Sequence, residues 1–584
     1  MLDPSVCLNV QNVGLIAQGS NWLPAFFTPI WLIGAGLILG AIVSAIVYGV
    51  LTALSFVPPL GRLADRRNAA VAASLIVGSV FATALCWTYV PRVGDGQYQN
   101  TLIPPLVVIG LILGFAVVYG MWHRTRQEWG QILTEGVMPY LLSTMGALAA
   151  LGLLATAWVP DRQEILASIG QVNLINDGTV VRSVEIPGIG DSDPDQAAFV
   201  PANIPYSLRS LSELQITSNR NIALTDSSNP VAFTRAPTRV FAGEELSYRY
   251  ADRDVPPIPG DASTLHIQNN ETDPATVTFR FTSRPDVPQV NSLVSIAAMF
   301  FLFISSVVAF RQAAPRVWAL ALSTAKNEMA QPLYLLLLAM GIAVVLFFGF
   351  FPFNTLGEDI RVLKDSGVTL IMVLGMLQAV WSAGTTVSEE IEGRTALTVL
   401  SKPVSRRSFV LGKYAGIMLA VLVLFAIISA VLLVVISYKP IYEARETTRA
   451  ATTWQVGHGE IMSTLPVLGL YFMETAAIGA VAVALATRLP LLANFITCFL
   501  VYVVGNLTSI LVLSAGQKFE LVEFVGKLIA VIVPNLNLFN VQSAIDADIS
   551  IPILYLAGTF NYLVCFVIMV WMFAMLLFQD RDLA

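Results

Sequence analysis

The charged segment from Ser388 to Lys413 carries the residue types best suited to docking another protein. It interrupts two long apolar stretches and reads SEEIEGRTALTVLSKPVSRRSFVLGK. Three glutamates precede Gly393, and two arginines and a lysine close the segment. Acids at one end and bases at the other would set how a docked partner is oriented, through electrostatic complementarity.

A short amphipathic helix is predicted inside this segment. Leu397, Leu400 and Val404 are spaced i, i+3 and i+7, which places them on one helical face. Pro403 is expected to end the helix, because proline lacks the backbone N–H and clashes with the preceding turn. Since a bare loop needs only a few polar residues, the pattern favours a helix held under the membrane and shaped to contact something else.

The same segment resembles the coupling loop of ABC-2 type permeases, the membrane subunits of one superfamily of ATP-binding-cassette transporters. The matching pattern is acid-x-x-x-Gly-Arg-Thr, then two leucines, then Pro-Val-Ser-Arg before a Gly-Lys pair. In that family the loop carries a coupling helix that sits in a groove of the cytoplasmic ATPase; the alternative is an ordinary basic loop. The residues that the resemblance assigns to the ATPase contact are Glu389, Glu390, Glu392, Gly393, Arg394, Thr395, Leu397, Leu400, Pro403, Ser405 and Arg406.

The resemblance implies a six-helix permease core over residues 314–584, which begins with an elbow helix at 314–332 before the first core span. It also implies a separate cytoplasmic ABC ATPase subunit, a homodimer or heterodimer of permeases, alternating access, and export. The chain has no Gly-x-x-x-x-Gly-Lys-Ser/Thr phosphate loop, so ATP would be used by the partner and no cofactor is expected here. No peptidase or hydrolase motif is present either, and the chain is not expected to be an enzyme.

Three polar residues are predicted to face the interior of the helix bundle. Glu474 falls near the middle of an apolar run, where a charged residue costs about 2.5–3.5 kcal/mol and usually faces a cavity or another helix. A transport pathway and a structural polar contact are both open for it. Gln378 and Asn506 are also assigned to the pathway, although a neutral amide more often joins two helices.

An outer gate is predicted before the last apolar run. The stretch 533–540 reads VPNLNLFN and looks like the proline-and-aromatic segment of ABC-2 proteins, which closes the outer end of the pathway. Its assigned residues are Pro534, Asn535 and Phe539, while the alternative is that Pro534 simply ends a helix.

Composition places the chain in a membrane. Of 584 residues, 55% are hydrophobic and 12% charged, against about 25% charged in soluble proteins. The net charge of −6 gives no footprint for nucleic acid, and membrane lipid is an expected partner. The fold class is therefore a mainly α polytopic membrane protein with about 11 transmembrane helices. The predicted spans are 30–57, 69–90, 103–122, 137–159, 290–310, 332–352, 367–387, 409–437, 461–487, 491–514 and 551–578.

Basic residues predict the orientation, because cytoplasmic loops are rich in lysine and arginine. Alternate loops carry fifteen such residues, and the opposite loops carry eight. The richer set includes the segment with Arg406, which places it in the cytoplasm. The protein is then expected in the cell (inner) membrane, with its N-terminus outside and its C-terminus in the cytoplasm.

Residues 160–289 are predicted to form an extracytoplasmic β-sandwich-like domain. They contain no spanning run, and the stretches 245–250 and 276–282 alternate apolar and polar residues with the period of strands. Asp177-Gly178 is a hairpin signal. The domains are then a four-helix membrane region at 1–159, the β domain at 160–289, a linking helix at 290–313 and the core at 314–584.

Two functions fit these features. The first is an ABC-2 type permease subunit, an exporter driven by a separate ATPase. The second is a membrane-anchored assembly or sensing scaffold whose external β domain binds a partner.

Overall fold

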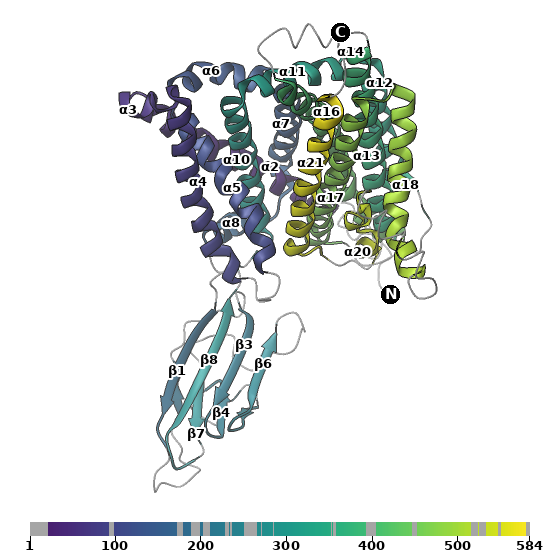
Figure 1. Cartoon of the computed structure of the whole chain (residues 1–584). Coiled ribbons are helices and arrows are strands. Elements are labelled where there is room, and N and C mark those ends of the chain that lie inside the picture. Colours follow the sequence, from purple (N-terminus) through teal and green to yellow (C-terminus); the bar gives the residue numbers. More distant parts are fainter. Residues whose placement is uncertain are drawn as a thin grey trace. The chain divides into compact units, whose positions relative to one another are not determined.

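The computed structural model is mainly helical, with two antiparallel four-stranded sheets inserted between helices, as the sequence predicts (Figure 1). The chain divides into a helical unit, made of the residues up to Val159 and from Ser292 onward, and a β unit at Pro160–Asn291. The residues that the structure describes are 22–92, 99–171, 179–188, 199–202, 211–227, 233, 236–249, 265–269, 271–283, 285, 287–351, 353, 358–392, 405–446, 452–515, 524, 533–546 and 550–579.

Ten helices of the described part are long and apolar enough to cross a membrane, which makes the chain a multi-pass membrane protein. An eleventh, α18 (Leu491–Ala515), is apolar over Leu491–Leu507 and corresponds to the remaining predicted span. The ten are built on α2 (Trp22–Leu54), α4 (Arg67–Tyr89), α5 (Ile103–Gly120), α7 (Met138–Ala155), α10 (Val290–Ala313), α12 (Pro332–Phe350), α13 (Asp359–Ala383), α16 (Arg406–Glu446), α17 (Trp454–Ala486) and α21 (Ile553–Gln579).

Short helices connect these spans. An amphipathic helix, α11, follows α10 where the elbow helix is predicted, and a π-helical turn, η10, continues α13. The short elements are α3 (Pro58–Gly61), η1 (Leu63–Asp65), η2 (Val90–Arg92), η3 (Gln99–Leu102), α6 (His123–Thr134), η4 (Thr156–Trp158), α8 (Arg162–Ala167), η5 (Ser168–Gln171), α11 (Pro315–Met329), η10 (Gly384–Ser388), α14 (Glu389–Glu392), η11 (Leu536–Leu538) and α20 (Gln542–Asp546).

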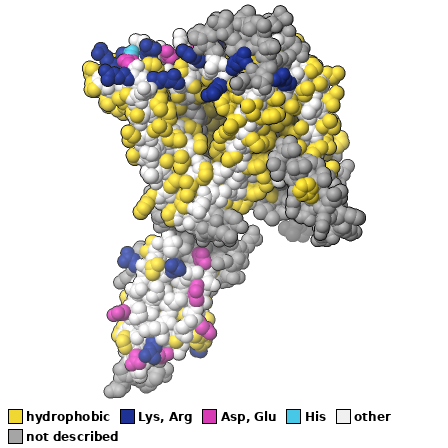
Figure 2. All heavy atoms as spheres, in the orientation of Figure 1, with side chains coloured by type: hydrophobic (Ala, Val, Ile, Leu, Met, Phe, Trp, Pro, Cys, Tyr) yellow, Lys and Arg dark blue, Asp and Glu magenta, His cyan; other side chains and the backbone are white. Residues whose placement is uncertain are grey.

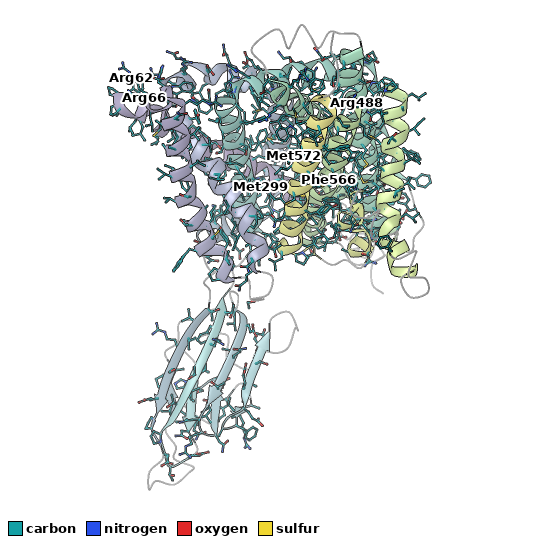
Figure 3. The ribbon with its side chains drawn as sticks, in the orientation of Figure 1. Arg62, Arg66, Met299, Arg488, Phe566 and Met572 are labelled. Carbon is teal, nitrogen blue, oxygen red and sulfur yellow. The ribbon has the colours of Figure 1, made fainter. Side chains whose placement is uncertain are left out.

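On the face drawn in Figure 2 the side of the helical unit is largely apolar, and the lysine and arginine side chains visible on that unit gather at one end. Trp87 and Phe350 are 86% and 70% exposed, as expected for side chains that face acyl chains instead of water. Arg62, Arg66 and Arg488 all lie at the basic end (Figure 3).

Small residues allow the first helices to pack closely. Helices α4 and α5 meet at Gly78, Gly110 and Gly114; a Cβ added at Gly114 would lie 2.4 Å from the Cα of Gly78. Without a hydrophobic force between helices in lipid, such close backbone contact is a main source of association. Helix α2 joins this group to the rest, because Ser437 of α16 donates a hydrogen bond to the Phe26 carbonyl at 2.7 Å.

Helices α13 and α16 extend beyond the predicted spans through charged residues. Helix α13 begins at Asp359 instead of residue 367, and α16 continues to Glu446 instead of ending at 437. The sequence-based boundaries stopped where charges appear. Those charges are buried in pairs: Lys439 lies 3.2 Å from Asp359, and Lys364 lies 2.6 Å from Glu460. Because each charge has a partner, both helices can continue through them.

The β unit has its own hydrophobic core between two sheets, with strand orders β1-β8-β3-β6 and β2-β7-β4-β5. Leu214, Val277 and Phe279 are fully buried in it. Both predicted strands are present as β6 and β8, whereas the predicted turn at 177–178 lies outside the described residues. The strands are β1 (Thr179–Ile186), β2 (Phe199–Pro201), β3 (Leu211–Ser218), β4 (Ile222–Thr225), β5 (Thr238–Val240), β6 (Glu245–Arg249), β7 (His266–Asn269) and β8 (Ala275–Ser283).

Candidate functional site

A buried carboxylate on α11 lies at the centre of the candidate site. Val317, Ala321, Ala325 and Glu328 recur at helical spacing on the face that α11 buries, and Glu328 has no exposed surface. Helix α11 is not among the candidate spans. A fully buried charge on an otherwise apolar stripe requires partners in the neighbouring helices.

Glycines bring α11 against α16. A Cβ added at Gly416 would lie 2.6 Å from the Ala321 carbonyl oxygen, and one added at Gly412 would lie 2.7 Å from the Leu320 side chain. The spacing of these glycines, i and i+4, puts both on one face of α16. The first turns of α16 therefore pack closely along α11.

Neutral donors from α13, from its continuation and from the residue before α12 surround the Glu328 carboxyl. The Ser382 hydroxyl donates a short hydrogen bond to Oε2, and Gln378 Nε2 donates to the same oxygen at 3.4 Å. On the other oxygen, Oε1, the donors are Gln331 Nε2 at 2.8 Å and Thr385 Oγ1 at 3.4 Å. None of these four hydrogen-bond partners carries a positive charge.

The π-helical turn Gly384–Ser388 lies beside Glu328 and leads into the charged segment. Thr386 donates its hydroxyl to the Ser382 carbonyl at 2.6 Å, and Ser388 donates to the Leu489 carbonyl at 2.8 Å. The second bond ties the turn to the connection between α17 and α18. Single π-helical turns inside α-helices are rare and often occur at functional sites.

An ion pair joins the two ends of the charged segment. Lys413 Nζ on α16 lies 2.5 Å from Glu390 Oε1 on α14, with side chains 5% and 29% exposed. Ser405 caps the start of α16, because its hydroxyl accepts the Ser408 N–H at 3.2 Å. Arg406 Nη1 donates to the Phe578 carbonyl of α21 at 3.4 Å.

Burial raises the pKa of the Glu328 carboxyl from 4.5 to about 7, although hydrogen bonds from Ser382 and Thr385 and the charge of Lys413 oppose the rise. The carboxyl borders a cleft of about 580 Å³, which Trp381, Glu389 and Glu390 also line. Near neutral pH this group can therefore gain or lose a proton next to the charged segment.

The predicted ATPase contact is only partly within the described residues. Glu389 and Glu390 lie in α14, Glu392 ends it, and Ser405 and Arg406 begin α16. The structure thus places the two ends of the segment together through the pair of Glu390 with Lys413. The predicted contact residues outside the described part of the chain are Gly393, Arg394, Thr395, Leu397, Leu400 and Pro403.

The three predicted pathway residues fall into two groups. Glu474 of α17 is 2% exposed and is hydrogen-bonded to the Asn506 side chain of α18. Gln378 is fully buried but belongs to the Glu328 group, through Ser382 and Glu328. Glu474 and Asn506 therefore join α17 to α18, while Gln378 joins α13 to α11.

The predicted gate residues pack between α18 and α21. Phe539 is fully buried, with its ring centroid 6.0 Å from that of Tyr562, and the Asn535 N–H donates to the Tyr562 hydroxyl at 2.8 Å. The Pro534 carbonyl lies against Gly505 of α18, where an added Cβ would be 2.7 Å away.

Glu328 was not predicted as a site residue. The sequence signal was present, because residue 328 continues the spacing of the apolar residues Val317, Ala321 and Ala325. Within the described residues, no group of three His, Cys, Asp or Glu side chains is arranged to hold a metal ion.

Comparisons with protein-family models, with curated proteins and with solved structures find no match to this chain. The class that the fold defines is a multi-pass membrane protein with an inserted β unit.

Proposed function

We propose that the chain is the permease subunit of an ABC-2-like exporter, driven by a separate cytoplasmic ATPase. The loop between α14 and α16 would dock on that ATPase, and the paired permease would be a second copy or a related chain. The basic end of the helical unit would then be cytoplasmic, and the β unit would lie on the opposite side of the cell membrane. Glu474 and Asn506 would border the transport pathway, closed outside by the segment around Pro534.

The observation that carries this proposal is the charged segment itself. Its pattern resembles the coupling loop of ABC-2 permeases, and its ends are anchored by a partly buried lysine–glutamate pair and by Ser388. An anchored loop can transmit a push to the helices at its ends, here α13 and α16, whereas a loosely tethered loop would absorb it. The packing of α11 on α16 gives that push a third helix to act on.

Two substitutions in the loop test the proposal. Gly393→Val places a β-branched side chain where a turn is expected, and Arg394→Glu reverses a charge on a face that the sequence predicts to be solvated. Both variants should express like the wild type but weaken pull-down of the cognate ATPase, or uncouple its turnover from transport in reconstituted vesicles. Arg162→Glu in α8 is the matched control, since it makes the same charge reversal on an exposed arginine outside the segment.

If both variants bind and couple like the wild type and the Arg162 control, the loop is not a coupling element. The scaffold function then moves ahead. One observation favours that alternative: the β unit folds around its own core and presents an edge strand, β1, whose Val180 and Val181 are 45% and 53% exposed. An exposed edge strand is a template for pairing with another chain.

A further inference from the structure

A groove on the side of the first helices has an apolar wall and a volume of about 500 Å³. Tyr48 of α2, Trp129 of α6, Leu142 of α7 and Phe300 of α10 contribute to its lining. The Tyr48 hydroxyl donates to Ser305 Oγ at 2.9 Å, so the most polar group of the wall already has a partner. The volume is within the range of about 300–1,000 Å³ that is usual for small-molecule sites.

Gly49 marks the open part of this groove. A Cβ added at Gly49 would meet no atom within 4 Å, and its neighbours Ile46 and Val50 are 61% and 55% exposed. Helix α2 is one of the candidate membrane spans. Because the surface around Gly49 is apolar and faces the bilayer, an acyl chain is the expected occupant of this part of the groove.

The cationic side chain of Arg126 lies about one helical turn from lining residues of the groove on both α6 and α2. Arg126 precedes Trp129 by three residues on α6, and its Nη1 donates to Ser55 Oγ at 3.4 Å. Ser55 in turn follows Thr52, another lining residue, by one turn. The Arg126 guanidinium lies 4.2 Å from the centroid of the Phe56 ring. Within the described part of the chain, neither of these two contacts of Arg126, Ser55 and Phe56, is an acidic side chain.

More arginines lie on the segments next to this position. The segment with α3 and η1 docks on the start of α6, since Trp122 Nε1 donates to Asp65 Oδ1 at 2.9 Å and His123 Nδ1 lies 3.1 Å from the Gly61 carbonyl. These two short segments carry five arginines and one aspartate: Arg62, Arg66, Arg67, Arg124, Arg126 and Asp65. They form a basic surface at the end of the unit where Figure 3 labels Arg62 and Arg66.

We propose that the groove binds an anionic phospholipid, with an acyl chain along Gly49 and the headgroup phosphate at Arg126. Arginine binds phosphate through charge-assisted hydrogen bonds, and an apolar groove next to it accepts the chain of the same molecule. Anionic lipid is favoured over zwitterionic lipid because each basic residue near the surface adds attraction for negative headgroups.

Quenching of tryptophan fluorescence tests this site. The full chain in detergent is titrated with dibrominated phosphatidylglycerol or dibrominated phosphatidylcholine, and the contribution of Trp129 is isolated by subtracting a Trp129→Phe variant. The wild type should be quenched at lower concentrations of phosphatidylglycerol, and Arg126→Gln should weaken that preference about fivefold. Gly49→Leu should abolish the Trp129 quenching by both lipids, because the side chain fills the open groove.

Gly469→Leu in α17 is the matched control, since Gly469 also has no atom within 4 Å of an added Cβ and lies outside the groove. It should leave both titrations unchanged. Equal quenching of Trp129 by the two lipids in the wild type would reduce the site to ordinary lipid contact and overturn the proposal. Unchanged phosphatidylglycerol preference in Arg126→Gln would overturn the headgroup assignment, even if Gly49→Leu fails to fold.

Discussion

The two ends of α13 bury charged side chains in different ways. At its start, Asp359 and Lys364 form ion pairs with Lys439 and Glu460. Past its other end, beside the charged segment, Glu328 is held by neutral hydroxyl and amide donors. A buried paired charge depends on its partner, because removing the partner leaves it uncompensated, whereas an acid held by neutral donors has no charged partner to lose. The first end is therefore built for fixed attachment, and the second for adjustment.

The largest effect is expected from breaking the fixed end. Lys439→Met removes the partner of Asp359 and the hydrogen bond to the Phe351 carbonyl. The side chains of Lys439 and Asp359 are only 0% and 3% exposed. Loss of one partner of a buried pair costs about 3–5 kcal/mol in the free energy of unfolding. Thermal unfolding in detergent should show a large fall in midpoint for Lys439→Met.

Lys326→Met is the control for this variant, because Lys326 is exposed on α11. The double variant Lys439→Met with Asp359→Leu should recover much of the lost stability, since it removes both charges. A fall as small as that of Lys326→Met would mean that the pair contributes little and that the contrast between the two ends is wrong.

The second largest effect concerns pH. The pKa of Glu328 is raised to about 7 in the folded chain, so between pH 4.5 and 7 the folded state binds more protons than the unfolded state. Stability must then fall as pH rises through this window and level off above it, by up to about 3 kcal/mol. Glu328→Gln mimics the protonated acid, so it should match the wild type near pH 5 and exceed it near pH 8 in thermal unfolding.

The matched control is Glu389→Gln, because Glu389 lines the same cleft but is exposed. It should keep the pH dependence of the wild type. If Glu328→Gln also keeps that dependence, Glu328 does not titrate in this range, and both ends of α13 are fixed attachments.

The sequence predicts the helix order well, because a spanning helix needs only a local run of apolar residues. The strands β6 and β8 were equally accessible, since alternation is a local signal. The start of α13 at Asp359 and the end of α16 at Glu446 were missed because their charges depend on distant partners. Glu328 was missed for the same reason: Ser382, its closest donor, lies 54 residues further along the chain.

The smallest effect is expected at the ion pair beside the adjustable end. Lys413→Met is the same substitution as Lys439→Met, but the Glu390 partner of Lys413 has a side chain that is 29% exposed and keeps access to water. The loss should therefore be roughly 1–2 kcal/mol, between the values for exposed and buried pairs.

Lys413 also lowers the pKa of Glu328, so its removal should raise that pKa further and extend the pH window of falling stability above 7. Thermal unfolding from pH 5 to 9, compared with Lys326→Met, measures both effects. A loss equal to that of Lys439→Met, with no shift of the pH window, would show that Lys413 is fixed as firmly as Lys439 and acts independently of Glu328.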